Sequence, residues 1–287
     1  MGFFSQYTSL VGSVILLSLI FLPFELIAPA EKHQHIAKRL FNLAYVPLFL
    51  ALAIFILQPL LNLIATQVLR LAGSGVLPQV IGPKGGPASQ LLFAIAFAFL
   101  WDLGQYWLHR LQHGVPSLWE THRFHHSDTA LNSTTQTRHH IFSYLLSVVF
   151  YLPVLILLGP RTPHFVATFV MFRLWGFVNH ANVRLQIGPL TPIVSGPQLH
   201  RIHHSIHPEH INKNFATFFP FIDIIFGTYY RPQRNEFPPS GLPAGQETNA
   251  LKEATIAPLL GWHKTSFAGI HKVRAAASSN TAITLKN

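Results

Sequence analysis

Apolar residues gather in long runs along the first part of the chain. The first run extends from Leu10 to Leu26, the second from Phe41 to Ile64 and the third from Gln90 to Leu108. A helix needs about 20 such residues to cross a hydrocarbon core roughly 30 Å thick. The three runs approach or exceed that length, so the pattern predicts three membrane-spanning helices.

Two shorter apolar runs follow, from Ile141 to Leu158 and from Phe165 to Val178, and Gly159-Pro160 lies between them. Gly and Pro together mark a turn, so we expect a pair of antiparallel helices. Such a pair could cross the membrane completely, or enter and leave it on one side. The expected fold class is all-α, an integral membrane helical bundle of about four to five apolar spans or re-entrant segments.

The first run has a second interpretation, because Ala28-Pro29-Ala30 resembles the cleavage site of a secretory signal peptide. A signal peptide also carries Lys or Arg before its apolar core. No basic residue precedes Leu10. We therefore interpret the run as a retained span.

Basic residues lie between the runs in two places. One group follows the first run and the other lies between the third and fourth runs: Lys32, Lys38 and Arg39, then Arg110, Arg123 and Arg138. Loops on the cytoplasmic side of a membrane carry an excess of Lys and Arg. We therefore expect both loops and the C-terminus in the cytoplasm, beneath a bacterial inner membrane.

The overall composition supports a membrane protein and restricts its chemistry. Hydrophobic residues make up 49% of the 287 residues and charged ones 10%, whereas soluble domains carry roughly 25% charged residues. The chain has no cysteine, which excludes thiolate zinc sites and iron–sulfur clusters. The net charge of +10 is scattered between apolar runs, so it favours contact with anionic lipid headgroups over nucleic acid.

The 18 histidines outnumber the 10 acidic residues, and their spacing divides the chain. Residues 1–88 form the N-terminal membrane spans, residues 89–231 contain the clustered histidines and form the expected catalytic region, and residues 232–287 form a polar cytoplasmic tail. The tail is rich in Pro, Gly, Ser and Thr, and we expect in it one short amphipathic helix near Ala250 to Leu260.

Three histidine boxes follow the third run. Box one is His109 and His113, box two is His122, His125 and His126, and box three repeats the second pattern as His200, His203 and His204. Residues three and four apart share one face of a helix, so each box can direct its imidazoles toward one place. The boxes therefore predict a histidine-rich site for one metal ion or for two adjacent ones, held by a cytoplasmic helical cap.

Other polar residues near the boxes complete the predicted site. His180 ends the last apolar run and is the expected ninth ligand, and Arg173 lies on the same helical face. Asp102 lies on the face of box one and would accept the second N–H of a ligating imidazole. The histidines that adjoin the boxes without their spacing are expected to be structural, or to support the ligands from behind: His139, His140, His207 and His210.

The ordered boxes HxxxH, HxxHH and HxxHH, interleaved with apolar runs, resemble the fatty acid hydroxylase/sterol desaturase superfamily. The resemblance extends from Phe93 to Tyr230 and includes Asn212-Lys213-Asn214-Phe215 and Phe226-Gly227-Thr228-Tyr229. The fatty acid 2-hydroxylase branch has another HxxxH where this chain has His180 and Arg184. The bacterial sterol-desaturase-like branch is therefore the nearer match.

The resemblance implies a membrane-bound oxidoreductase. Two iron ions bound by the nine histidines would use O2 to hydroxylate or desaturate a C–H bond of a fatty acyl, sterol-like or isoprenoid lipid. An external electron donor, a redox partner protein, would supply electrons. Imidazole alone does not select iron, so zinc could substitute for it.

Three alternatives remain open from the residues themselves. A zinc membrane hydrolase would suit the histidines, but HExxH is absent and the nearest candidate bases are Glu120 and Glu209. A metal transporter would place polar residues within several spans, whereas the boxes lie at span ends and in loops. A purely structural membrane protein would have no use for repeated boxes.

Overall fold

The computed structural model describes residues 2–72, 86–158, 163–242, 249–256 and 258–262. Over these ranges the chain forms helices, turns and loops. Two isolated β-bridges, Pro29 with Val183 and Ser205 with Ser240, are the only strand-like pairings within them. The prediction of an all-α fold is confirmed.

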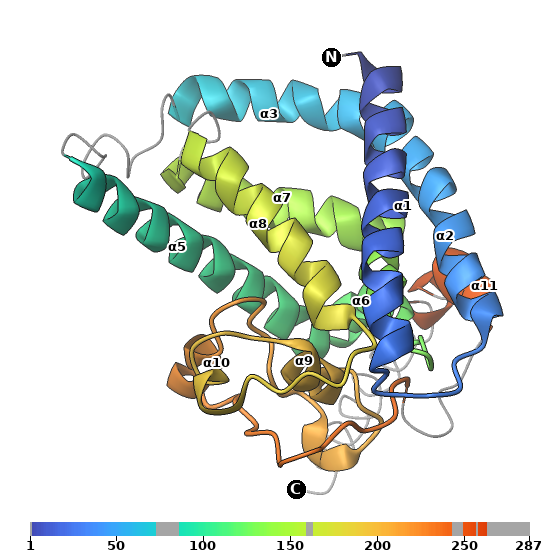
Figure 1. Cartoon of the computed structure of the whole chain (residues 1–287). Coiled ribbons are helices and arrows are strands. Elements are labelled where there is room, and N and C mark those ends of the chain that lie inside the picture. Colours follow the sequence, from blue (N-terminus) through green and yellow to red (C-terminus); the bar gives the residue numbers. More distant parts are fainter. Residues whose placement is uncertain (1, 73–85, 159–162, 243–248, 257, 263–287) are drawn as a thin grey trace, which may run out of the picture.

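The N-terminal helices form one side of the bundle. α1 (Phe3–Ile27) packs against α2 (Ile36–Ala51), which continues through the π-helix η1 (Leu52–Leu57) into α3 (Gln58–Ala72). A π turn adds a residue to the helical repeat, which commonly bends a helix. Figure 1 shows the result, since α2 runs alongside α1 while α3 lies across the end of the bundle. The predicted second span is therefore a bent helix.

Three further helices form the other side of the bundle. They are α5 (Pro87–Gly114), α7 (Ile141–Leu158) and α8 (Pro163–His180), and α5 contacts both of the others. By length and hydropathy, three helical stretches of the described chain could cross a membrane: Phe3–Ile27, Ile36–Ile64 and Pro87–Gly114. α7 and α8 correspond to the predicted helix pair, whose connecting residues 159–162 lie outside the described ranges. A fourth and a fifth span stay a prediction.

Two apolar clusters hold the bundle together. Val14, Val46 and Phe177 join α1, α2 and α8, while Phe97 and Phe172 join α5 and α8. Many large apolar side chains on the outside of the same helices are exposed, including Leu16, Leu19, Ile20, Leu91 and Leu92. Exposed apolar surface of this extent marks contact with a membrane or a partner, and its place on the long apolar helices favours lipid.

A helical cap covers one end of the bundle, the lower end in Figure 1. Its elements are short: α6 (Pro116–His126), η2 (Ser133–Thr137), η3 (Gly188–Leu190), α9 (Pro197–His203), η4 (Pro208–His210), α10 (Phe221–Ile225) and α11 (Ala250–Thr255). The junction between α1 and α2 lies at the same end, where Lys38 bonds to Thr129. The two basic loops of the sequence are therefore on one side of the bundle.

A buried carboxylate connects α1 to this cap. Glu25 is 3% exposed and pairs with Arg39 of α2, with 2.7 Å between Oε2 and Nη2. Its Oε1 accepts the backbone N–H of Ser133 at 2.7 Å and that of Asn182 at 2.9 Å. One side chain thus joins α1, α2, η2 and the segment that follows α8.

The predicted C-terminal tail packs against the cap in its described part. Ser240 accepts the N–H of Leu131 at 3.2 Å, and the buried Glu253 pairs with Arg123 of α6 at 3.1 Å. The helix expected from Ala250 to Leu260 appears as α11, which ends at Thr255, and a further helical stretch covers residues 258–262. Residues 263–287 lie outside the described ranges.

Candidate metal centre

A sharp turn brings the first two boxes together. α5 ends at Gly114, and Val115, which precedes a proline, is extended with φ −106° and ψ 116°. The residue before proline avoids the helical conformation, whereas proline itself suits the first turn of a helix. α6 therefore begins in a new direction at Pro116, and its histidines face those at the end of α5.

The third box and His180 approach from the opposite side. Gly196 is extended and Pro197 begins α9, a helix of seven residues that carries His200 and His203, with His204 at its end. α9 packs against α8, which places box three beside His180, the last residue of α8. All nine predicted ligands are thereby brought to one place in the cap.

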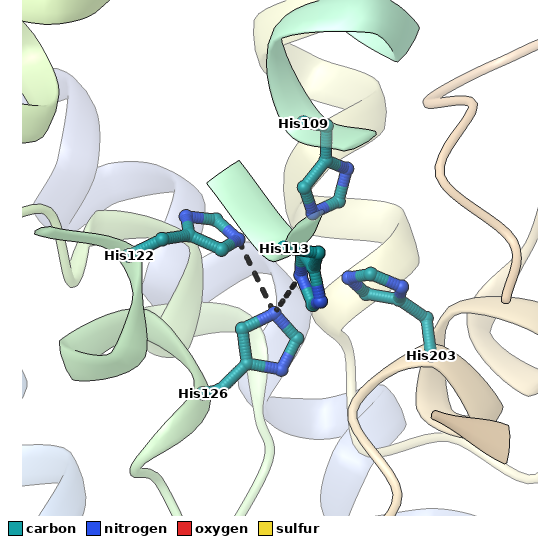
Figure 2. Close-up of side chains that lie close together, drawn as sticks. All are labelled: His109, His113, His122, His126 and His203. Carbon is teal, nitrogen blue, oxygen red and sulfur yellow. Dashed lines mark hydrogen bonds between the residues drawn. The ribbon is translucent and has the colours of Figure 1, made fainter. Parts of the chain in front are cut away.

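The nine imidazoles form two groups. The first contains His109, His113, His122, His126 and His203, and the second contains His125, His180, His200 and His204. Within each group one nitrogen of every ring lies within 4.8 Å of all the others. Figure 2 shows the first group converging from α5, α6 and α9. Neither group includes a carboxylate.

The nitrogen separations test whether a metal ion fits. Nε2 of His126 lies 3.1 Å from Nε2 of His113 and 3.2 Å from that of His122. In the second group, Nε2 of His180 lies 3.0 Å from those of His125 and His200. Two nitrogens that bind one ion at about 2.1 Å with a right angle between them are about 3.0 Å apart. In each group the spacing therefore fits nitrogens that bind the same ion.

Backbone carbonyls fix the tautomer of three of these rings. Nδ1–H of His109 donates to the Phe215 carbonyl at 2.9 Å, that of His180 to Gly176 at 2.7 Å and that of His203 to Lys213 at 2.8 Å. Each bond leaves the lone pair of Nε2 directed into the group. Nε2 of His109 and of His203 is buried without a hydrogen-bond partner, as a ligand awaiting a cation would be.

Burial also favours the neutral, metal-binding form of the cap histidines. The pKa of each box-two and box-three imidazole is lowered well below 6.5, first by burial and then by the neighbouring imidazoles: His122, His125, His126, His200, His203 and His204. An uncharged imidazole offers a lone pair, whereas imidazolium offers none. The groups suit a divalent ion with nitrogen ligands.

Asp102 has a different partner from the one predicted. Its carboxylate accepts the backbone N–H groups of Thr217, Phe218 and Phe219 at 3.0, 3.0 and 2.7 Å, and no imidazole N–H donates to it within the described chain. The expectation of a direct bond to box one is wrong, because the unpaired amides of this buried segment need the acceptor. Asp102 instead anchors the segment whose Phe215 carbonyl binds His109.

The remaining histidines near the boxes lie outside both groups, as expected. His139 stacks on His125 with ring centroids 5.5 Å apart, and Nδ1 of His140 accepts the N–H of Phe142. His210 contacts Ser205 and Glu236. His207 is partly exposed and pairs with Glu209. Arg184 lies over the ring of Phe237 at 5.1 Å and not in a group.

The comparison with known proteins gives this constellation its family. Residues 94–228 match the family described as fatty acid hydroxylase, and this range contains every box and His180. The histidine-box region belongs to the fatty acid hydroxylase/sterol desaturase superfamily. The narrower assignment to a bacterial sterol-desaturase-like branch stays a prediction.

Relatives of this superfamily region have been named for lipid oxidation. The chain is 35% identical to alkylglycerol monooxygenase of Danio rerio over 45% of its length and 28% of the relative's. It is 33% identical to ornithine lipid hydroxylase of Rhizobium tropici over 51% of this chain and 44% of the relative. It is 27% identical to Delta(7)-sterol 5(6)-desaturase of Gibberella zeae over 46% of this chain and 39% of the relative. The chain thus spans less than half the length of these relatives, and no solved structure matches it.

A cavity of 270 Å³ opens onto the two histidine groups. His109 and His122 of the first group line it, as do His125, His180 and His200 of the second. Side chains of α5, α7 and α8 form most of its other walls, so it extends from the cap into the bundle. A second cavity of 210 Å³ reaches His113, His126 and His203 from another side.

The groups that hold the predicted ligands in place were not predicted from the sequence. Asp223 accepts the N–H groups of Phe215 and Ala216 at 2.8 and 2.9 Å, and so shares the anchoring role of Asp102. Asn212 and Asn214 have φ of 60° and 58°, a left-handed conformation that asparagine tolerates better than most residues. The Asn212-Lys213-Asn214-Phe215 motif could have indicated this segment, whose carbonyls at 213 and 215 hold His203 and His109.

Proposed function

We propose that the chain is an integral membrane enzyme that uses O2 to hydroxylate or desaturate a C–H bond of a lipid, at two iron ions held by the nine box histidines. One observation carries this proposal. The cavity between α5, α7 and α8 is lined by imidazoles of both groups and, farther along, by Trp101, Tyr151 and Phe172. A lipid chain in this cavity would lie against both ions.

The chain's own residues position and protect the reaction. Iron bound here would supply the power to activate O2 and to oxidise an unactivated C–H bond. The imidazoles hold the ions, the carbonyls of residues 176, 213 and 215 fix three of the rings, and the apolar walls exclude water. In hydroxylation one oxygen atom of O2 enters the C–H bond and the other leaves as water, so two electrons and two protons must come from outside.

Hydroxylation is the favoured outcome. The two relatives above 30% identity described here are named a monooxygenase and a hydroxylase, and the desaturase is less similar. A redox partner protein would deliver electrons at the cap. Both basic loops lie at that end, which by the positive-inside rule supports a cytoplasmic cap and C-terminus.

A zinc hydrolase is less well supported. Such an enzyme needs a carboxylate near the ion as general base, and neither histidine group includes one. Glu120 pairs with Arg123 at 3.5 Å, and Glu209 is exposed beside His207. Neither candidate base belongs to the centre.

Metal content and labelled oxygen test the proposal together. Protein purified without chelators should contain about two metal ions per chain, with iron in the active form and zinc as an inactive substitute. With a reductant and a lipid extract, the iron form should transfer one atom of ¹⁸O2 into lipid, or form a double bond with consumption of O2. One ion per chain after reconstitution would contradict the dinuclear centre, and lipid cleavage without O2 would favour the hydrolase.

A further inference from the structure

The cavity beside the histidine groups has an apolar part and a polar part. Trp101, Tyr151, Phe169 and Phe172 line the apolar part, and Phe169, which is 47% exposed, reaches the outer surface of α8. The cavity wall therefore reaches the outer surface of the bundle at Phe169. The polar part is defined as Gln136, His139, Arg173 and Asn179, and it adjoins the histidine groups because His139 stacks on His125.

Arg173 is a cation without a protein counter-charge. Within the described chain its guanidinium forms no ion pair and no hydrogen bond, although its side chain is only partly exposed. It lines the cavity of 270 Å³ beside the histidines and also an adjoining one of 60 Å³. It lies on α8 seven residues before His180, on the same helical face. An unpaired charge within a bundle of apolar helices is unfavourable and commonly marks a binding site.

Two buried carboxylates on elements that pack against α8 or lie beside η2 already have other partners. Asp102 accepts three backbone amides, and Asp128 accepts from Asn42 and Thr135 at 2.9 and 2.8 Å. The histidine groups bring no negative charge of their own. Two divalent ions would therefore add to the charge of Arg173, and an anion in the cavity would offset both.

Gln136 is held beside Arg173 by close packing. It belongs to η2, and a side-chain carbon at Gly176 of α8 would collide with its amide. The glycine therefore admits the Gln136 side chain against α8, in the same wall of the cavity as Arg173 and His139. An amide that can donate hydrogen bonds next to a guanidinium suits an oxygen-rich anion.

From these contacts we propose that Arg173 binds an anionic oxygen group, a phosphate or a carboxylate, at the polar end of the lipid substrate. This inference rests on the proposed function. The headgroup enters the polar part beside the histidines and the chain extends past Phe169 into the bilayer. The oxidised carbon then lies close to the headgroup and not in the middle of the acyl chain.

Ligands of equal chain length separate the contribution of the anionic group to binding from that of the apolar chain. Labelled dodecyl phosphate is bound to the purified full-length protein in neutral detergent and competed with dodecanoate or with dodecanol. Wild type should prefer at least one anion over the alcohol by about 10-fold or more, as expected for a charge-assisted hydrogen bond. Comparing the two anions distinguishes phosphate from carboxylate.

Matched variants assign the preference to Arg173. Arg173→Gln should lose the preference for the anion at unchanged metal content, and Arg173→Lys should keep part of it. Arg184→Gln is the control, because Arg184 stacks on Phe237 outside the cavity, and it should bind like wild type. The metal content of each variant reports whether its centre is intact.

Equal binding of alcohol and anions by wild type would overturn the inference, as would an anion preference that survives in Arg173→Gln. These results are distinct from failure of the proposed function. Binding needs no turnover. An Arg173-dependent preference for the anion without lipid oxidation would therefore support the anion site and contradict the proposed function. Oxidation of a neutral lipid at equal rates by wild type and Arg173→Gln would support the proposed function and contradict the anion site.

Discussion

His109, His180 and His203 each give one ring nitrogen to a backbone carbonyl and keep the other for the centre. The box spacing was sufficient to predict which residues converge, because three- and four-residue intervals fix the face of a helix. It could not predict the carbonyl partners. Any backbone oxygen can accept a ring N–H, so nothing in the side chains of residues 176, 213 and 215 identifies them.

The division of the histidines into two groups predicts how substitutions combine. His125→Ala removes a ligand from the second group and His203→Ala one from the first. Each single variant should reduce lipid oxidation per folded protein to background. The double variant should lose little more, since residues that act as one unit are strongly non-additive.

His207→Ala is the matched control for these variants. The His207 ring lies outside both groups and is partly exposed, so this variant should oxidise lipid at close to the wild-type rate. Modest, additive losses in the His125 and His203 variants would contradict a single cooperative centre. Full activity of either single variant would contradict it outright.

Among the structural elements, the segment from Phe215 to Phe219 was the least predictable from sequence. It has no regular secondary structure, and its shape comes from two carboxylates of other elements, Asp102 in α5 and Asp223 in α10. The apolar runs, by contrast, indicated α1, α5, α7 and α8 correctly. The bend at η1 was not predicted, because the run from Phe41 to Ile64 was interpreted as one span although Gln58 and Pro59 interrupt it directly after η1.

The anchoring of this segment predicts the effect of Asp102→Asn. The amide keeps only one acceptor oxygen for three backbone N–H groups, so the Phe215 carbonyl should shift away from His109. We expect metal affinity to fall by about 10–100-fold, the usual loss when a group that orients a ligand is removed. The fraction of metal that the protein retains at increasing chelator concentrations measures this affinity.

Glu209→Gln serves as the control for this substitution, since Glu209 is an exposed acid whose only described ion pair is with His207. It should retain metal like wild type. If Asp102→Asn also retains metal like wild type, the segment does not depend on this carboxylate for its position. Loss of folded protein would show instead that the three amide bonds are needed for the fold.

For the whole molecule, nine imidazoles gathered in one buried place make stability depend on pH. The unfolded chain titrates its histidines near 6.5, whereas burial lowers the pKa of the folded cap histidines well below that value. Between these values the unfolded state binds more protons, so the free energy of unfolding falls with falling pH. The contribution of the neutral buried imidazoles to stability is complete above pH 6.5 and is lost progressively as the pH falls below that value.

We therefore expect the metal-free protein to unfold at a markedly lower temperature at about pH 5.5 than at about pH 7.5. Thermal unfolding in detergent with a chelator measures this difference. The His125/His203 double alanine variant carries fewer buried imidazoles and should show a smaller difference. Equal unfolding temperatures at both pH values would contradict the burial of neutral rings, while bound metal should raise stability most at the higher pH.

The contacts of Glu25 have a consequence for protein engineering. The family match begins at residue 94, which invites the exchange of residues 94–228 between relatives as if they were an independent module. Yet the amides of Ser133 and Asn182, inside that range, bond to a carboxylate on the first helix of the chain. A chimera that leaves α1 behind would bury two unpaired amides next to the centre, so the first helix and the boxes should be transplanted as one inseparable unit.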